Sequence, residues 1–273
     1  MSLQAVEKVV ILARGLGTRM KRADGSAALD EGQRAAAETG VKALIPIGRP
    51  FLDYILSALA DVGYGRVCLV VAPDHRVIRQ YYDEAKPTRL RIEYAVQQEP
   101  RGTADAVAAA EAFAAGDPVL AINSDTYYPL EALRRLRDHE GSAAALFEQD
   151  AMFAGSNISA ERIRQFAVGR IDGAGRLTRI LEKPDEATLA SLARPLWLSM
   201  NCWRFGPPIF EACRKIRPSP RGELEVTDAV QYAIDVLGEP FAAVCVRAPV
   251  LDMTSRQDVA TIGPKLAGIE VRL

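Results

Sequence analysis

Short apolar runs alternate with longer amphipathic stretches through the first half of the chain. This alternation is typical of strand–helix units arranged around a largely parallel sheet. Residues 51–62, for example, place leucine and isoleucine at helical spacing, which gives one apolar face that can pack on a sheet. The pattern predicts strands over residues 8–13, 66–72, 90–97, 118–123 and 143–147, and helices over residues 51–62, 103–115 and 129–139.

The second half of the chain has a different pattern, with more strands and a glycine-bearing turn. Residues 165–171 and 176–182 flank Asp172-Gly173-Ala174-Gly175, which predicts a β-hairpin. Further along, the pattern predicts strands over residues 197–205 and 241–246 and helices over residues 207–215, 225–237 and 255–266. These elements favour one mixed α/β domain over residues 1–273, with a mostly parallel sheet and an inserted β-rich substrate lobe.

The composition excludes several functions. The chain has 273 residues, with 34 Lys plus Arg against 35 Asp plus Glu and a net charge of −1. It lacks the basic balance of a general nucleic-acid-binding protein, so an anionic ligand must be held by a local site. The longest apolar runs are about six residues, against the roughly 18 needed to span a bilayer, and no secretory signal is evident. We therefore expect a soluble cytoplasmic protein that binds neither nucleic acid nor membrane.

The cysteines and histidines do not indicate metal or nucleophilic chemistry. The four cysteines are widely spaced and form no C-x-x-C pair, so neither a disulfide framework nor a zinc site is expected. The two histidines are also far apart in the sequence, which gives a Ser-His-Asp triad little support.

The predicted strand 8–13 ends in a glycine-bearing turn, Ala13-Arg14-Gly15-Leu16-Gly17-Thr18, which is followed by Arg19. Glycine lets the backbone approach a phosphate closely, and arginine supplies a fixed fork of donors for phosphate oxygens. The segment is not a dinucleotide fingerprint, which would need glycine where Met20 stands, and it lacks the Gly-Lys-Ser/Thr of a P-loop. Taken alone, it is either a phosphate site or an ordinary strand-to-turn connection.

Two aspartates follow apolar segments and are candidate metal ligands. Asp125 comes just after the predicted strand 118–123, at the carboxyl end where open α/β sheets bind ligands. A carboxylate there can hold Mg²⁺ together with substrate phosphates. A helix-capping role for Asp125 fits less well, because the next predicted helix begins at Pro129. The spacing of Asp252 alone favours an ordinary turn aspartate over a second ligand.

Further segments accompany the glycine-bearing turn in a fixed order. They are Lys42-Ala43-Leu44-Ile45-Pro46, Gln97-Gln98-Glu99-Pro100-Arg101-Gly102-Thr103-Ala104, Asn123-Ser124-Asp125, Glu182-Lys183-Pro184, Arg221-Gly222-Glu223-Leu224-Glu225-Val226-Thr227-Asp228 and Leu251-Asp252. The set resembles the sugar-1-phosphate nucleotidylyltransferases over nearly the whole chain. The resemblance implies a Rossmann-like, GT-A-type nucleotidyltransferase fold, with a nucleotide-binding part at 1–148 and a sugar-phosphate-binding part at 149–273.

The resemblance also implies roles for individual residues. Nucleotide binding is implied for Ala13, Gly15, Gly17, Thr18, Arg19, Gln97, Gly102 and Thr103, substrate binding for Lys42, Glu182, Lys183, Asn201 and Arg221, and metal binding for Asp125 and Asp252. Arg19, Lys183 and Asp125 match the catalytic group. Without the resemblance, Lys183 and Arg221 are equally well explained as solvated cations. Gln97 could then be a strand-end residue and Gly102 a turn residue.

The chain departs from the family pattern at several positions. Glycine is usual where this chain has Arg14, Ser124 and Ala167, and a Lys-Pro pair is usual where it has Lys42-Ala43. The usual Asp-x-Gly-Thr segment is here Asp252-Met253-Thr254-Ser255. These differences leave the base and the sugar open. Residues 21–41 form a long insertion that is either a mobile lid or a surface excursion.

The resemblance implies an enzyme that transfers a nucleotidyl group from a nucleoside triphosphate to a sugar 1-phosphate and releases pyrophosphate, with Mg²⁺ as cofactor. Such transfer depends on positioning and charge neutralisation, which suits a site of Arg, Lys, Asp and glycine backbone. Two alternatives stay open: a non-sugar phosphate acceptor such as phosphocholine, and a non-catalytic nucleotide-sensing subunit. The resemblance is also compatible with assembly into a homo-oligomer. With elements assigned as far as residue 266, we expect no additional hexapeptide-repeat domain.

Overall fold

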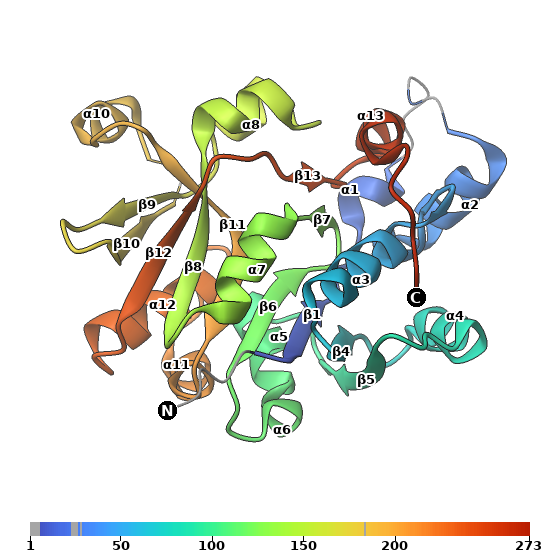
Figure 1. Cartoon of the computed structure of the whole chain (residues 1–273), viewed down its shortest axis with the longest axis horizontal. Helices are drawn as coiled ribbons and strands as arrows, with labels where there is room; N and C mark the ends of the chain where they lie inside the picture. The colour runs from blue at the N-terminus through green and yellow to red at the C-terminus, as the bar shows by residue number, and fades with distance from the viewer. Residues whose placement is uncertain (1–5, 23–26, 28, 183) are drawn as a thin grey trace.

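The computed structural model describes residues 6–22, 27, 29–182 and 184–273 (Figure 1). Within these residues a nine-stranded sheet has the strand order β5-β4-β1-β6-β11-β8-β12-β10-β9. Its strands are β1 (Lys8–Leu12), β4 (Arg66–Val71), β5 (Arg91–Val96), β6 (Val119–Asn123), β8 (Ser142–Glu148), β9 (Val168–Ile171), β10 (Arg176–Leu181), β11 (Trp197–Phe205) and β12 (Phe241–Val246). Two small sheets pair β2 (Pro46–Ile47) with β3 (Arg49–Pro50), and β7 (Thr126–Tyr127) with β13 (Leu251–Asp252).

The large sheet contains both parallel and antiparallel pairs. β1 pairs in parallel with β4 and β6, so that Val10 lies opposite Cys68 on one side and Ala121 on the other. β11 runs antiparallel between β6 and β8, and β8 pairs in parallel with β12. The α/β class is therefore confirmed, and the sheet is mixed, with four parallel and five antiparallel pairings among the described residues where the sequence predicts a mostly parallel sheet. The parallel strands bring their carboxyl ends to one edge, where ligands bind in open α/β sheets.

Helices cover both faces of the sheet and complete two hydrophobic cores. Alternate side chains of β1 point to opposite faces, so Val9 and Ile11 enter one core and Val10 enters the other. The first core also includes α3 (Phe51–Val62), α4 (Arg76–Ala85), α7 (Leu130–Asp138) and α13 (Arg256–Leu266), and the second includes α5 (Thr103–Ala109), α6 (Glu111–Ala114), α11 (Pro208–Lys215) and α12 (Val226–Asp235). The result is a helix–sheet–helix sandwich (Figure 1).

Several helices lie where the apolar pattern does not predict them. Besides α4, they are α1 (Thr18–Lys21), α2 (Glu31–Thr39), the 3₁₀ turn η1 (Lys42–Leu44), α8 (Gln149–Gly155), α9 (Ala160–Ile163) and α10 (Glu186–Ser191). Such helices are short or bury little: α2 buries only Ala37, and α10 buries no side chain. The predicted helix 103–115 is instead two helices, because the backbone leaves helical geometry at Ala110. Among the described residues, no helix has the length and apolar character needed to cross a bilayer.

The predicted hairpin in the second half of the chain is present as β9 and β10. Asp172 stabilises its turn, because one carboxylate oxygen accepts the backbone N–H groups of Ala174 and Arg176 at 2.9 Å each. β10 pairs antiparallel with β12, and β9 also pairs with β11 through Val168 and Leu198. The inserted strands therefore extend the large sheet itself, and the strands β11, β8, β12, β10 and β9 form a closed circuit of pairings.

Candidate active site

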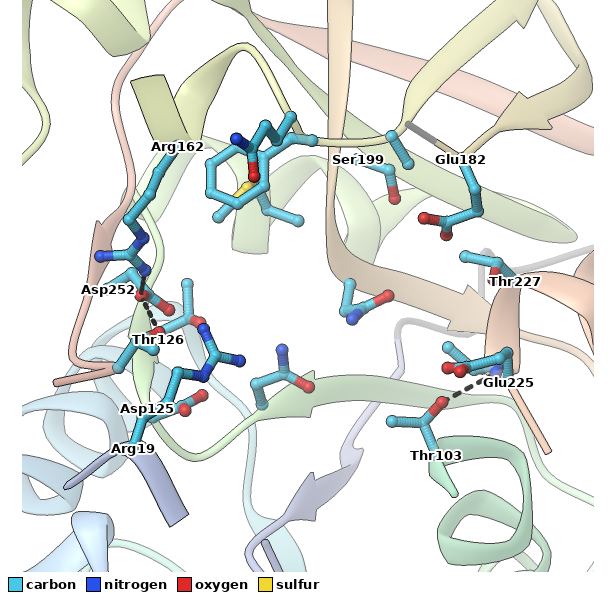
Figure 2. Close-up of a pocket in the computed structure, with 18 of the residues that line it drawn as sticks. Arg19, Thr103, Asp125, Thr126, Arg162, Glu182, Ser199, Glu225, Thr227 and Asp252 are labelled. Atoms are coloured by element: carbon cyan, nitrogen blue, oxygen red, sulfur yellow. Dashed lines mark hydrogen bonds and ion pairs between the residues drawn. The ribbon is translucent and has the colours of Figure 1, made fainter. Parts of the chain in front are cut away.

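Two cavities meet at the edge of the sheet where β1 and β6 end. The larger has a volume of about 560 Å³ and the smaller about 380 Å³. Arg19, Lys42, Thr103, Asn123 and Asp125 border both, so these residues form a shared wall. In Figure 2, Arg19, Asp125, Asp252 and Arg162 lie on one side of the larger cavity, across from Glu182, Glu225 and Thr227.

The smaller cavity lies beside the turn that joins β1 to α1. Ala13, Gly15, Gly17 and Thr18 all line it. Gly17 has a φ of +61°, and a Cβ on it would lie 2.6 Å from the Cα of Gly40 and closer still to the Gly40 carbonyl oxygen. A Cβ on Gly15 would meet no atom within 4 Å. Gly17 is thus required by the fold of the turn, whereas Gly15 leaves open space on the cavity side.

The end of the insertion at residues 21–41 packs against this turn. Asp30 and Gln33 form a reciprocal capping box at the start of α2, and the Gln33 Nε2 donates to the carbonyl of Pro46 at 3.0 Å. Ala37 is fully buried, and Gly40 touches Gly17. Within the insertion, residues 23–26 and 28 lie outside the described residues. The described residues from 29 to 41 are therefore part of the packed structure beside the smaller cavity.

Arg19 occupies the shared wall of the two cavities. It lies on the exposed face of the short helix α1. Within the described part of the chain, its guanidinium group forms no hydrogen bond or ion pair. An unpaired, exposed guanidinium beside a cavity can receive two oxygens of one phosphate through parallel N–H donors.

Asp125 and Asp252 are brought together by the pairing of β7 with β13. Asp252 lies opposite Thr126 in this pair, and the backbone N–H of Met253 donates to the carbonyl of Asp125 at 2.8 Å. Asp252 is only 8% exposed. Burial, and then the negative charge of Asp125, raise its pKa to about 6. The two carboxylates are therefore close enough to repel each other, a repulsion that a cation would relieve.

Each carboxylate has one oxygen held by the protein. The Lys42 ammonium lies 2.7 Å from the Asp125 Oδ2, and the Arg162 Nη2 lies 2.6 Å from the Asp252 Oδ1, which also accepts from the Thr254 hydroxyl. No donor among the described residues reaches the Asp125 Oδ1 or the Asp252 Oδ2. The described residues contain no cluster of three or more His, Cys, Asp or Glu side chains that could hold a metal. A cation here would take its protein ligands from these two aspartates.

Arg162 is a site residue that the sequence does not indicate. It lies on α9, whose start is capped by Ser159, and its guanidinium contacts both Asp252 and Asp258, the latter at 3.0 Å. Asp258 in turn accepts the backbone N–H groups of Thr254 and Ser255 at 3.0 Å and 2.7 Å. Of the contacts in this network, the sequence pattern indicates only the capping box at the start of α13, which Ser255 and Asp258 form. Arg162 itself lies in a helix that the pattern misses.

Gln97 and Gly102 line the smaller cavity, which Asp125 also borders. The Gln97 Nε2 donates to the Gly102 carbonyl at 3.0 Å and to the Asp105 Oδ2 at 2.8 Å. Gly102 has a φ of +122°, and a Cβ on it would lie 2.6 Å from the backbone nitrogen of Leu224. Glycine is therefore required at 102 by its own backbone and by this close approach.

The loop that carries Arg221 is attached to the start of α5. The backbone N–H of Leu224 donates to the carbonyl of Arg101 at 2.7 Å, and the Leu224 carbonyl accepts from the N–H of Ala104 at 2.8 Å. The Thr103 hydroxyl oxygen accepts the backbone N–H of Val226 at 2.8 Å. Thr103 thus joins the start of α5 to the start of α12, and it also lines both cavities.

The far side of the larger cavity carries the remaining predicted substrate residues. Glu182, Asn201 and Arg221 line it, and Arg221 pairs with Glu225 at 2.7 Å. Asn201 lies at an irregularity in β11 and has a φ of +54°. Residues other than glycine seldom adopt this left-handed backbone conformation unless their surroundings hold them in it. Lys183 lies outside the described residues. Every other predicted site residue borders one of the two cavities.

Residues 37–246 match the model of a protein family described as "Nucleotidyl transferase". Relatives include a low-salt glycan biosynthesis nucleotidyltransferase, Agl11, and a UTP–glucose-1-phosphate uridylyltransferase, AglF, both of Haloferax volcanii, at 29% and 27% identity. A glucose-1-phosphate thymidylyltransferase of Streptomyces antibioticus is 30% identical. The matches cover 84%, 83% and 84% of this chain, and 59%, 83% and 57% of the respective relatives.

The fold is similar to that of solved structures. A UDP-glucose pyrophosphorylase complexed with UDP-glucose superposes with a TM-score of 0.72 at 18% identity, over 95% of this chain and 98% of that chain. A putative glucose-1-phosphate thymidylyltransferase from Bacillus anthracis superposes with a TM-score of 0.70, also at 18% identity, over 96% of each chain. At this level of identity the similarity is one of fold.

Proposed function

Because the chain belongs to the nucleotidyl transferase family of enzymes, which confirms the resemblance in its motifs, we propose that it transfers a nucleotidyl group from a nucleoside triphosphate to a sugar 1-phosphate. The observation that carries the proposal is the shared wall of the two cavities, where Arg19, Lys42 and Asp125 border both. A triphosphate in the smaller cavity and a sugar phosphate in the larger one would meet at this wall. The names of the relatives, which include uridylyl- and thymidylyltransferases acting on glucose 1-phosphate, support the same reaction.

The proposed reaction needs no nucleophilic side chain. An oxygen of the sugar 1-phosphate forms a bond to the α-phosphorus, the bond from that phosphorus to the oxygen bridging the β-phosphate breaks, and pyrophosphate leaves. The protein contributes by holding the two reactants in line and by neutralising negative charge. A site of arginine, lysine and carboxylate side chains, with an open glycine turn, is suited to this task.

The side chains of Arg19 and Arg221 are suited to bind different phosphate groups, one on each substrate. Arg19 follows the glycine turn and is the candidate for the triphosphate and the departing pyrophosphate. Arg221 lines the larger cavity and is the candidate for the attacking sugar phosphate; its five N–H donors allow it to keep Glu225 as a partner. We also propose Lys183 for that phosphate, from its place in the Glu-Lys-Pro motif. Glu182 and Asn201 are the candidates for the sugar.

The carboxylate pair fits Mg²⁺ as a cofactor. Mg²⁺ is usually held in proteins by one or two carboxylates, with waters and substrate phosphates completing its shell. Asp125 and Asp252 each offer an oxygen that no described donor reaches, and burial, followed by the negative charge of Asp125, raises the pKa of Asp252. We propose that these two aspartates hold Mg²⁺, which when bound would withdraw negative charge from the substrate phosphates.

Pyrophosphate release tests this function. Purified protein is incubated with each of UTP, dTTP, CTP, ATP and GTP, paired with a panel of sugar 1-phosphates and with phosphocholine. We expect release that needs both substrates and stops when Mg²⁺ is chelated. If phosphocholine is the only acceptor that gives release, the acceptor is a non-sugar phosphate ester and not a sugar 1-phosphate. Nucleotide binding without release from any pair would instead favour a sensing subunit.

Replacing Arg162 by alanine tests the structure of the carboxylate pair. The change leaves Asp252 and Asp258 without their common cation, and we expect a loss of about 2–4 kcal/mol in the free energy of unfolding. Excess Mg²⁺ should raise the melting temperature of this variant more than that of the unmodified protein, because the cation replaces the missing positive charge. Arg164→Ala, which removes a guanidinium stacked on Phe153, is the matched control. A Mg²⁺ response equal in both variants would contradict the assignment of Asp252.

A further inference from the structure

Arg256 is a buried arginine that joins α13 to α1. It is the first residue of α13 and is only 7% exposed. Its Nε donates to the backbone carbonyl of Met20 in α1 at 2.9 Å, across 236 positions of sequence, and α13 lies beside α1 in Figure 1. Arg256 borders neither of the two cavities described above. Any effect of Arg256 on a bound substrate must therefore pass through α1.

The helix α1 depends on contacts from outside itself. It has only four residues, and no described side chain caps its start at Gly17. A helix this short is not stable in isolation, and the last four carbonyls of a helix have no partner within it. Met20 is fully buried, so its carbonyl would be costly to leave without a donor. Arg256 supplies that donor, and its positive charge suits the carboxyl end of a helix.

The direction of the Arg19 side chain is set by this helix. Arg19 adjoins Met20 and borders both cavities from the exposed face of α1. Within the described part of the chain its guanidinium has no partner, so no contact of its own holds it in place. Its position comes from the backbone of α1, which is held at its start by the packing of Gly17 on Gly40 and near its end by Arg256.

The segment that carries Arg256 also carries Asp252. Asp258 accepts the backbone N–H groups of Thr254 and Ser255 at 3.0 Å and 2.7 Å, which fixes the connection between β13 and α13. Asp252 lies at the start of this connection and Arg256 at its end. The candidate metal ligand and the support of the candidate phosphate arginine are thus placed by one short, hydrogen-bonded turn.

We propose that Arg256 is a positioning residue for nucleotide binding, which fixes α1 and thereby holds Arg19 at the shared wall. The inference rests on the proposed function in taking Arg19 as the arginine that binds the triphosphate. If α1 were loose, each binding event would have to order the helix and its arginine, and that cost would weaken the affinity. The sugar 1-phosphate, which is assigned to other side chains, should be affected much less.

Nucleotide binding to the intact protein tests this inference without requiring turnover. The probe is the tightest binder among UTP, dTTP, CTP, ATP and GTP, measured by calorimetry with Mg²⁺. Arg256→Met removes the donor and should raise the Kd about tenfold, because the buried carbonyl is left unpaired and α1 shifts. Arg256→Gln carries an uncharged N–H donor as many bonds from the backbone as the arginine Nε, and should restore the Kd to within about threefold.

The matched control for these variants is Lys8→Met. Lys8 is also a buried cation, only 7% exposed, and its ammonium donates at 2.7 Å to the carbonyl of Ala114, at the end of the four-residue helix α6. It borders neither of the two cavities. We expect this variant to lower the melting temperature as Arg256→Met does, but to change the Kd by less than about twofold, because distant sites act independently.

A double-mutant cycle with Arg19→Ala separates positioning from stability. Arg19→Ala alone should raise the Kd about 10- to 100-fold, the loss expected for a hydrogen bond to a charged phosphate. If Arg256 acts through Arg19, adding Arg256→Met should raise the Kd by less than about twofold further, although the melting temperature falls in both backgrounds. If Arg256→Met is too unstable to purify, the cycle uses Arg256→Lys, whose ammonium lies one bond beyond the arginine Nε, with an expected effect of about threefold.

Steady-state kinetics give a second measurement. In Arg256→Met the KM of the nucleotide should rise about tenfold and that of the sugar 1-phosphate by less than about twofold. An equal rise of both, additive effects in the cycle, or an unchanged Kd in a folded Arg256→Met variant would overturn the inference and leave the proposed function standing. Unchanged binding in Arg19→Ala would contradict the triphosphate role of Arg19 and the inference with it. If the cycle is non-additive while no pyrophosphate is released, the inference stands and the proposed transfer fails.

Discussion

Replacing Asp125 by asparagine is expected to lower kcat by about two to three orders of magnitude while the fold stays intact. Asp125 lies on the shared wall of the two cavities, in the short connection between β6 and β7, and contacts Lys42 at 2.7 Å. Asparagine has the same shape, and its oxygen can still accept from Lys42, but it loses the charge that would hold Mg²⁺. Steady-state rates of pyrophosphate release with saturating substrates measure the effect.

The control for this variant is Asp117→Asn. Asp117 pairs with Lys8 at 2.7 Å, and neither residue borders the two cavities described above. We expect unchanged turnover in the control and nearly equal unfolding transitions in both variants. Because the charge of Asp125 contributes to the raised pKa of Asp252, that pKa should fall in Asp125→Asn, while burial continues to raise it. Full activity in a folded Asp125→Asn variant would contradict the metal assignment.

Replacing Gly17 by alanine is expected to destabilise the protein by about 2–5 kcal/mol and to abolish nucleotide binding. The estimate adds about 1–2 kcal/mol for a left-handed alanine to about 1–3 kcal/mol for the clash with Gly40. The added methyl must push the glycine turn away from the end of α2. Since this turn lines the smaller cavity, the displacement removes the candidate phosphate site.

Gly15→Ala is the matched comparison, because it changes the same turn by the same methyl group. A Cβ at this position meets no atom of the described residues within 4 Å, so the free energy of unfolding should change by less than about 0.5 kcal/mol. Denaturant unfolding and calorimetric titration with a nucleoside triphosphate separate the two variants. Equal stability of the two variants would show that the contact of Gly17 with Gly40 does not constrain the turn.

The strands are the part of the fold that the sequence predicts well. A strand buried on both faces, such as β1 with Val9 and Val10 in different cores, needs an uninterrupted apolar run, and such runs are visible locally. The order of the strands is not local. The insertion of β11 between β6 and β8 depends on packing of segments far apart in the chain. The polar helices α2 and α10 escape prediction because they bury almost no side chains.

The residues of the candidate site also differ in how well the sequence predicts them. Asp125 is predictable because it ends an apolar strand at the ligand-binding edge of a parallel sheet. Asp252 reaches it through β7 and β13, a pair of two-residue strands with no detectable periodicity, so only the family resemblance indicates it. The resemblance implies substrate binding for Lys42, which in the structure borders both cavities and contacts Asp125. Arg162 belongs to a four-residue helix and carries no sequence signal.

Following the α-phosphorus of the nucleotide tests the central claim most directly. The protein is incubated with Mg²⁺, glucose 1-phosphate and a uridine or thymidine triphosphate labelled at the α-phosphorus, and the labelled species are separated. We predict that the label appears in a nucleotide sugar, with one pyrophosphate released for each labelled molecule formed. If the acceptor is another sugar 1-phosphate, the same result appears with that sugar. Label that remains in bound triphosphate, or that appears only in the free nucleoside monophosphate, would contradict nucleotidyl transfer.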